Sequence, residues 1–381
     1  MKNLKLVIWA VVVLVVVWFG YRWWSQRSGE STVDQDVIKV GFMGPLSGDA
    51  AAYGEPYRRM VELAVEEINN DGGVDGKSLE VIYEDSKCNG KDGANAAQKL
   101  VNVDEVEVII GPFCSSESLA AIPIVEEAEV AMLSPGASSP DLTGKSRFFV
   151  RNYPSDATQG KVLAEAASAR GWKKVAVLQE QSDYPLGIYK AFSENFEKLG
   201  GTVVKEEFPT NTTDFRSLIT KLKGEKPDAL LIDPQTPANG ERALKQLSDL
   251  GWRPALMIND AVSGDPKTVE NNRTILEGAL AAEFGVDPEN QKFQHAVQIY
   301  QEAYGEEPPF QSYAQTEYDA VYLLRDALLA VGNYGAAVAD WYRTVIDWDG
   351  ASGLTTIGEN GDRAGGHVLK VIKSGRVEVA K

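Results

Sequence analysis

Serines and glycines gather where predicted strands end, a chemistry suited to binding an anion. Ser115 and Ser116 follow the apolar run VEVIIG, and the segment SPGASSP (134–140) follows the next apolar run. Where a helix begins at such a place, its first N–H groups are unpaired and its dipole favours negative charge. Two such loops side by side would form a clamp for a carboxylate. The structural alternative, that Ser115 and Ser138 are ordinary helix N-caps, fits the same pattern and stays open.

Signals for covalent, metal or nucleotide chemistry are missing from the sequence. It holds no G-x-S-x-G nucleophile elbow, no phosphate-binding G-x-x-x-x-G-K-[ST] and no G-x-G-x-x-G fingerprint. The two histidines, His295 and His367, have no metal-ligand spacing and lie outside the strand-end loops. We therefore expect no catalytic residue, no metal and no cofactor. The formal net charge of −17 argues against nucleic acid as a partner.

The N-terminus predicts a membrane helix. Lys2 and Lys5 precede sixteen uncharged, mostly apolar residues, 6–21. As a helix these span roughly 24 Å, and the tryptophans around them suit the membrane interface. We expect residues 6–24 to stay in the membrane, because no A-x-A cleavage site and no cysteine of a lipid anchor follows. A cleaved signal peptide is the alternative, and with either one the chain beyond the polar tether, 25–36, is exported.

Export would allow the two cysteines to form a disulfide. In an oxidising compartment Cys88 and Cys114 can form a disulfide. The loop of about 25 residues that it closes would stabilise the fold by roughly 3–4 kcal/mol. Such a bridge would hold the Ser115 loop against the preceding connection. Two unpaired buried thiols are the alternative.

From residue 38 onward, strand-like runs alternate with helical patterns, and the alternation restarts near residue 157. This order predicts two units with parallel strands and helices on both faces. The C-terminal part predicts helices near 288–304, 314–331 and 334–346, then a hairpin that turns at Ser374-Gly375. The strand-like runs are IKVGFM, LEVIYED, VEVIIG and VAML, followed by KKVAVLQ, TVVKEEF, DALLID and ALMIND.

Several pieces of the chain resemble the type I periplasmic substrate-binding proteins that serve ABC transporters for branched-chain amino acids. The pieces occur in the same order as in that family, across residues 38 to about 380. The resemblance implies two doubly wound α/β lobes joined by three crossovers, with the ligand held between them. It also implies the Cys88–Cys114 disulfide, since the family has one there. The matching pieces are IKVGFMGPLSGDAAAYG, AVEEINNDGGVDGKSLEVIYEDSKCNG, AAQKLV, VIIGPFCSSES, MLSPGASSPDLT, TTDFRSLITKLK and DALLID.

The resemblance also suggests how the chain divides. We expect a membrane anchor and tether over residues 1–35. We expect one lobe from 36–156 plus 284–345, and the other from 157–283 plus 346–381.

Head-group residues can be carried over one by one. Ser115 matches the serine that holds the ligand α-carboxylate, with Ser116 beside it. Asp260 stands where the family has an acidic residue for the ammonium, one methylene shorter than the usual glutamate; as an alternative, it caps a helix over 265–272. The loop expected to take both the carboxylate and the ammonium holds Gly136, Ala137 and Ser138.

Tyrosines match positions whose rings line the family site, and two departures concern specificity. The tyrosines are Tyr53, Tyr184 and Tyr313, for which core or surface packing is the alternative. Thr236 stands where branched-chain binders have tyrosine, and Phe113 changes the pocket floor. The head-group site is thus retained, while a branched-chain preference does not follow.

Together these features indicate an extracytoplasmic, membrane-anchored binding protein that is not an enzyme. We expect it to capture an amino acid or close analogue by hinge closure and to present it to the permease subunits of an ABC importer. The alternative is a ligand-sensing ectodomain or a partner of a signalling receptor. Since the stub MKNLK is too short to signal alone, sensing would need another subunit.

Overall fold

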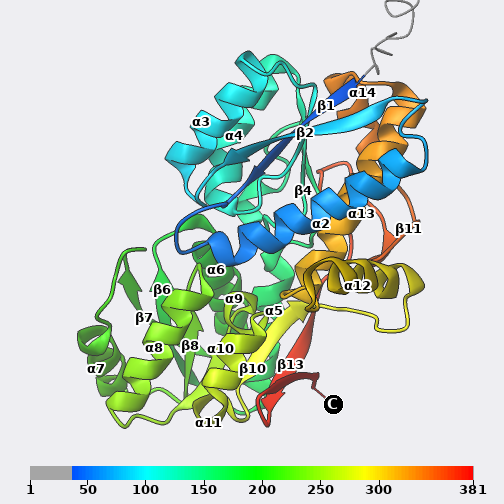
Figure 1. The fold of residues 1–381 in the computed structure, drawn as a ribbon. Helices are drawn as coiled ribbons and strands as arrows, with labels where there is room; N and C mark the ends of the chain where they lie inside the picture. The colour runs from blue at the N-terminus through cyan, green and yellow to red at the C-terminus, as the bar shows by residue number, and fades with distance from the viewer. Residues whose placement is uncertain (1–36, 381) are drawn as a thin grey trace, which may run out of the picture. The chain divides into compact units, whose positions relative to one another are not determined.

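The computed structural model describes residues 37–380, which contain two large β-sheets with helices packed on them (Figure 1). The predicted membrane helix and tether, residues 1–35, lie outside the described residues. Within the described range, no helix is long and apolar enough to cross a membrane.

The first sheet has five strands in the order β2-β1-β3-β4-β5. The pairs β1–β3, β3–β4 and β4–β5 are parallel, as the β-α alternation predicts. The three-residue strand β5 was not predicted. The strands are β1 (Val37–Gly44), β2 (Ser78–Asp85), β3 (Val108–Ile110), β4 (Ala131–Ser134) and β5 (Phe149–Arg151). The elements between them are α2 (Ala51–Asn70), α3 (Gly90–Asn102), α4 (Ser115–Ala128) and the 3-10 turn η1 (Pro140–Leu142).

The second sheet has seven strands in the order β14-β13-β10-β9-β8-β6-β7. It is parallel from β7 to β10, and its last two strands are antiparallel. All five residues of β8, ALLID, are buried, as expected for a strand covered by helices on both faces. The strands are β6 (Lys174–Glu180), β7 (Thr202–Phe208), β8 (Ala229–Asp233), β9 (Ala255–Ile258), β10 (Leu280–Phe284), β13 (His367–Lys373) and β14 (Arg376–Val379). The helices are α5 (Asp156–Ala169), α6 (Asp183–Lys198), α7 (Arg216–Gly224), α8 (Pro237–Asp249), α9 (Asp260–Ser263), α10 (Pro266–Asn271) and α11 (Arg273–Leu276).

The predicted C-terminal hairpin is confirmed. Strands β13 and β14 pair around a turn at Ser374 and Gly375, whose φ angles of 50° and 75° are both positive. Two consecutive positive φ values are typical of the type I′ turns that connect tight hairpins.

The chain passes three times between the two sheets. The first passage joins β5 to α5, and the second joins β10 to α12 (Gln291–Tyr304). Helices α13 (Gln311–Val331) and α14 (Gly335–Tyr342) then pack with α2 and β4 beside the first sheet, and the third passage leads to β13. These passages give the α/β fold with two parallel-sheet lobes that the sequence predicts.

One segment sits differently from the expected division at residue 346. The short hairpin of β11 (Trp348–Gly350) and β12 (Gly353–Thr355) is held by α13, because Asp319 on that helix accepts hydrogen bonds from the backbone N–H groups of Ala351 and Ser352 at 2.6 and 2.8 Å. Only the strands after it join the second sheet. The return to the second lobe therefore falls between β12 and β13.

Candidate functional site

The loop between β3 and α4 is fixed from two sides. Cys114 is the N-cap of α4 and forms a disulfide with Cys88, with their Cα atoms 5.3 Å apart. The backbone N–H of Cys114 donates to Oε1 of Glu117 at 2.6 Å. The predicted cysteine pairing is thus confirmed, and the bridge ties Ser115 to the β2–α3 connection.

Glu117 is a buried acid at this helix start. Burial raises the pKa of Glu117 to about 7, and the hydrogen bond from the Cys114 backbone opposes this shift only in part. The carboxyl group therefore titrates near neutral pH.

The two serine loops lie side by side, as predicted. Oγ of Ser115 accepts a hydrogen bond from the backbone N–H of Ser139 at 3.1 Å, which joins the β3–α4 loop to the loop after β4. Ser138 is buried, and its Oγ has no hydrogen-bond partner among the described residues. An unpaired buried hydroxyl is costly unless a ligand or water completes its bonding.

Aromatic rings fill the space in front of these loops. The ring centroid of Phe113 lies 5.3 Å from that of Tyr53 and 5.0 Å from that of Tyr313. Tyr153, which the sequence analysis did not identify, stacks on Tyr313 at 4.7 Å. All four side chains are at most 5% exposed, so they form a packed aromatic cluster.

Asp260 anchors this cluster. Its carboxylate accepts hydrogen bonds from the hydroxyls of Tyr153 and Tyr313, each at 2.8 Å, and from that of Tyr184. Asp260 is the first residue of α9, and the helix over 266–271, α10, is capped by Asp265, so the alternative role of Asp260 as its cap does not apply. Burial, and next the charge of Asp260, raise the pKa of Tyr153 well above its usual value, which keeps the hydroxyl protonated as a donor.

Asp156 is a second buried acid near the site, and sequence reasoning missed it. Its carboxylate oxygens make no well-formed hydrogen bond within the described part of the chain, although the Ser138 hydroxyl is close enough to oppose the rise of its pKa. Its backbone N–H donates to the carbonyl of Ser138 at 2.8 Å, which places it beside the unpaired serine. Burial, and then the nearby charge of Asp260, raise the pKa of Asp156 well above its usual value.

The basic groups near these acids offset their negative charge only in part. Burial lowers the pKa of His367 to about 4, so the imidazole that lies 3.8 Å from Asp156 is neutral at pH 7. Arg151 is fully buried and pairs at 2.8 Å with Asp362. The site therefore presents acidic groups that would favour a cationic group on a ligand.

A cavity of about 10 Å³ remains between the serine loops and the aromatic cluster. Six of the ten predicted site residues line it, and sequence reasoning missed Gln235, which approaches from the second sheet. The lining residues are Tyr53, Phe113, Cys114, Ser115, Gly136, Ser138, Tyr184, Gln235 and Tyr313.

The other four predicted residues surround the cavity. Asp260 lies behind the tyrosines. Ser116 accepts a hydrogen bond from the backbone N–H of Asp183, and the carbonyl of Ala137 accepts one from Arg151. Thr236 is the N-cap of α8, where its Oγ1 accepts from the Asn239 backbone at 3.3 Å. Thr236 thus serves a local structural role.

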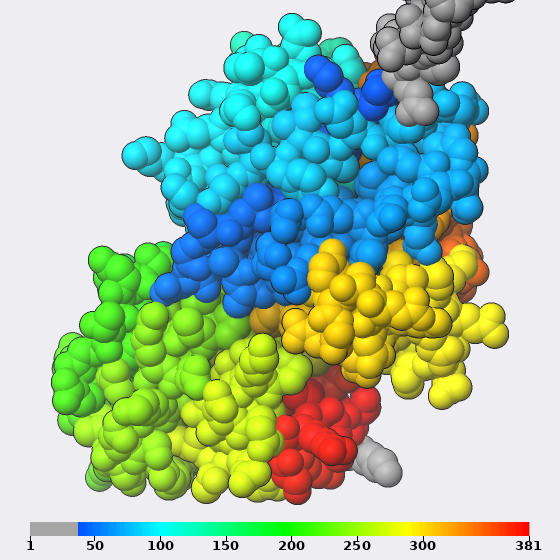
Figure 2. Space-filling model, viewed as in Figure 1, coloured from blue at the N-terminus to red at the C-terminus, as the bar shows by residue number. Residues whose placement is uncertain are grey.

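A hydrogen bond and an ion pair join the two lobes across the cavity. The hydroxyl of Tyr53 donates to the carbonyl of Gln235 at 3.1 Å, and Lys190 pairs with Asp141 at 3.0 Å. A groove of about 1,000 Å³ between α2 and α10 opens on the face shown in Figure 2. Phe310 lines this groove and packs on Tyr53 at 4.8 Å between ring centroids, so aromatic side chains separate the groove from the cavity.

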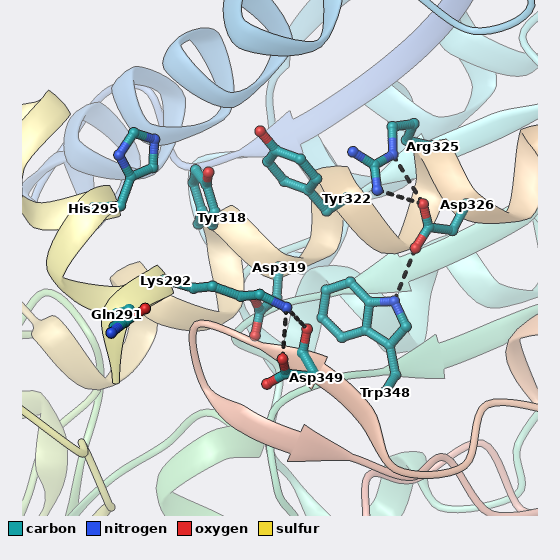
Figure 3. Close-up of a pocket in the computed structure, with 10 residues that line it drawn as sticks. All are labelled: Gln291, Lys292, His295, Tyr318, Asp319, Tyr322, Arg325, Asp326, Trp348 and Asp349. Carbon is teal, nitrogen blue, oxygen red and sulfur yellow. Dashed lines mark hydrogen bonds and ion pairs between the residues drawn. The ribbon is translucent and has the colours of Figure 1, made fainter. Parts of the chain in front are cut away.

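A further hollow of about 390 Å³ lies between α12, α13 and β11 (Figure 3). Four of its charged side chains pair with one another, since Lys292 bonds to Asp349 and Arg325 bonds to Asp326, and Asp319 accepts from the Ala351 backbone. Trp348 also donates to Asp326, at 2.9 Å. This internal pairing leaves the aromatic cavity as the better candidate. Among the residues described, no cluster of three or more His, Cys, Asp or Glu could hold a metal ion.

Comparisons with known proteins agree with this geometry. A sequence model described as periplasmic binding protein matches residues 37–373. The "Amino acid binding protein" of Pseudomonas aeruginosa is 30% identical over 84% of this chain and 86% of its own length. The leucine-binding protein LivK of Thermotoga maritima has a TM-score of 0.83 and 28% identity, covering 91% of this chain and 98% of its own. LivJ of Streptococcus pneumoniae, solved with isoleucine, has a TM-score of 0.81 and 28% identity over 91% of this chain and 99% of its own. The chain therefore belongs to the periplasmic binding protein family, whose members bind solutes outside the cytoplasm.

Proposed function

We propose that the protein captures an amino acid or a close analogue between its two lobes and presents it to the permease subunits of an ABC importer. The observation that carries this proposal is that the buried Ser138 hydroxyl and the Asp156 carboxylate, which lie close together without a well-formed hydrogen bond, sit beside the Ser115 loop. A molecule with both a carboxylate and an ammonium would complete the hydrogen bonding of both kinds of group.

The carboxylate would lie against the start of α4. Ser115 opens this helix, where N–H groups and the helix dipole favour an anion. Ser115 and Ser138 are 1% exposed, so a carboxylate bound there is shielded from water. The names of the Pseudomonas and Thermotoga relatives support an amino-acid ligand.

The ammonium would lie toward the acids. Asp156 offers acceptor oxygens, and Asp260 adds negative charge behind the tyrosine hydroxyls. Because the carboxylate end lies at the first sheet and Asp260 follows β9 of the second sheet, a ligand with both groups favours the closed arrangement.

A thermal-shift screen of the purified full-length protein against the common amino acids and short amides tests the proposal. A ligand at 100 times its dissociation constant should stabilise the protein by about 2.7 kcal/mol. Ser138→Ala should then weaken the best ligand by about 1.5–3 kcal/mol, since it removes one hydrogen bond to a charged group. A matched control is Ser168→Ala, on α5, whose side chain takes no part in the site. Equal affinity of Ser138→Ala and the parent protein would contradict the head-group clamp.

We also propose that residues 6–24 keep the protein in the membrane. The proposal rests on the sixteen uncharged residues after Lys5 and on the missing cleavage site. Intact mass of the membrane-extracted protein should include the N-terminal residues. A mature N-terminus near Gly29 or beyond would show a cleaved signal peptide instead.

A further inference from the structure

Asp156 and His367 face each other at the place where the chain passes between the two sheets. Asp156 opens α5 directly after the first passage, and His367 opens β13 directly after the third. Both side chains are fully buried, and Nε2 of His367 lies 3.8 Å from Oδ1 of Asp156. Neither atom makes a well-formed hydrogen bond within the described part of the chain. Two buried polar atoms that face each other in this way require a proton between them.

The hydroxyl of Thr158 indicates which nitrogen of the ring carries a proton. Oγ1 of Thr158 donates to the carbonyl of Ser155 at 2.9 Å and lies 2.7 Å from Nδ1 of His367. A hydroxyl has one proton to donate, so this oxygen accepts a hydrogen bond from Nδ1–H. The neutral imidazole then carries its proton on Nδ1, and Nε2 presents a bare lone pair to Asp156. In the opposite tautomer, the hydroxyl would lose its bond to the Ser155 carbonyl.

The charges around Asp156 favour a protonated carboxyl group. Burial, and then the charge of Asp260, raise the pKa of Asp156, and the opposing charge of Arg151 is shared with Asp362. Burial lowers the pKa of His367 to about 4, so the imidazole does not take this proton. The polar and titratable groups that face Asp156 are Ser138, Arg151 of β5, Tyr153 of the first passage, Tyr184 of α6, Asp233 of β8, Asp260 of α9 and His367 of β13.

The ammonium of a bound amino acid would change this balance. In the proposed function the ammonium lies toward Asp156 and Asp260, and a cation within about 4–6 Å of a carboxyl group favours its ionised form. The cavity of about 10 Å³ has room for about one water molecule. A ligand therefore reaches Asp156 only after the lobes part, and the same movement gives the proton a path to solvent.

Resting on the proposed function, we infer that Asp156 carries a proton in the ligand-free protein, directed toward Nε2 of His367, and releases it when an amino acid is captured. The proton passes from the carboxyl oxygen to water or buffer, and the ligand ammonium becomes the positive partner of the carboxylate. Because release of a proton is favoured at higher pH, affinity should rise with pH until the amine of the ligand loses its own charge.

Titration calorimetry of the full-length protein in buffers of different ionisation enthalpy counts the released protons. The probe is the common amino acid that gives the largest thermal shift. We expect release of about one proton per ligand near pH 6, and an affinity that rises about tenfold per pH unit. Asp156→Asn keeps a neutral group in place, so it should release less than about 0.2 proton. The matched control is Glu317→Gln, a buried acid on α13 whose pKa is raised by burial alone; it should behave as the parent protein does.

Magnetic resonance of the imidazole nitrogens tests the ligand-free state separately. The sequence has two histidines, so His295→Gln, which removes the more exposed one, assigns the signals of His367. We expect the Nδ1–H tautomer and a neutral ring from about pH 5 to about pH 8. A proton on Nε2 would leave Asp156 ionised and would overturn the inference.

The outcomes separate the two proposals. Binding of an amino acid without release of a proton would keep the proposed function and overturn the inference. Release that persists in Asp156→Asn would assign the proton to another acid and would overturn it too. If no common amino acid binds, the proposed function fails, and proton release fails with it. Should Asp156→Asn not fold or not bind, the proton count and the tautomer in the parent protein decide the question.

Discussion

Replacing Asp260 tests whether one buried carboxylate organises the aromatic side of the site. The carboxylate is fully buried and accepts hydrogen bonds from three tyrosine hydroxyls, those of Tyr153, Tyr184 and Tyr313. Asp260→Ala leaves all three hydroxyls without this acceptor. We therefore expect a loss of folding stability as well as of ligand affinity.

The size of the effect follows from these bonds. Each buried donor left unsatisfied costs about 1–3 kcal/mol, so three such donors cost about 3–9 kcal/mol. Relief from burying the charge offsets several kcal/mol of this. We expect Asp260→Ala to lower the free energy of unfolding by up to about 6 kcal/mol, the difference between these two terms.

A double-mutant cycle with Tyr153→Phe isolates one bond. Tyr153 is outside the cavity lining, and its hydroxyl donates to Asp260 at 2.8 Å. Alone, Tyr153→Phe should cost about 1.5–3 kcal/mol, as for a hydrogen bond to a charged group. In the Asp260→Ala background it should be neutral or stabilising by up to about 3 kcal/mol, because it removes a buried hydroxyl that has already lost this acceptor.

Denaturant unfolding of the four proteins measures the coupling, with Glu289→Ala as an exposed acidic control. Additive effects, with a coupling below about 0.5 kcal/mol, would refute the idea that Asp260 holds the tyrosines. In ligand titrations, Asp260→Ala should lose about 2–5 kcal/mol of binding free energy, the cost of removing one member of a desolvated charge pair. Binding within threefold of the parent protein would show that the ligand carries no ammonium near Asp260.

Three further predictions concern the surroundings of the site. Peptide mapping without reduction should find Cys88 linked to Cys114, and free thiols in the native protein would contradict this. Replacing both cysteines by serine should lower the free energy of unfolding by about 3–4 kcal/mol, because the disulfide joins residues 26 positions apart. Because the pKa of Glu117 is raised, the folded protein binds this proton more tightly than the unfolded chain does. The contribution of Glu117 to stability therefore falls by about 3 kcal/mol as pH rises from about 4.5 to about 7. Glu117→Gln should flatten that part of the curve of stability against pH, and an unaltered curve would refute the assignment. A Cβ on Gly187 would meet Cδ of Pro140 at 2.6 Å across the two lobes. Gly187→Ala should therefore disfavour closure and weaken ligand binding at least tenfold, with the ligand-free melting temperature unchanged. Unchanged affinity would show that closure tolerates the methyl group.

Local sequence patterns were enough to predict the strands and turns whose own residues carry a clear pattern. The run DALLID is a strand because apolar residues fill it from end to end, and Ser374-Gly375 is a hairpin turn because its position between two strand-like runs requires positive φ. Strands that carry little pattern of their own were missed, among them β5, with three residues, and the hairpin of β11 and β12. Their partners are distant in the chain, so no short window reveals them.

The same contrast holds for the site. Ser115, Ser138 and the cysteine pair could be predicted because they belong to strand-end loops, and loops at the carboxyl ends of parallel strands meet at one edge of a sheet. Asp156 lies where the chain passes from one sheet to the other, and Gln235 comes from the second sheet, so only the packing of the two lobes brings them to the first-sheet loops. The sequence by itself determined which residues stand at strand ends. Only the tertiary structure decided whether Thr236 faces a ligand or caps α8, and whether Asp260 is open or enclosed by three tyrosines. The reason is that the direction of a side chain depends on how its element packs against segments far away in the sequence.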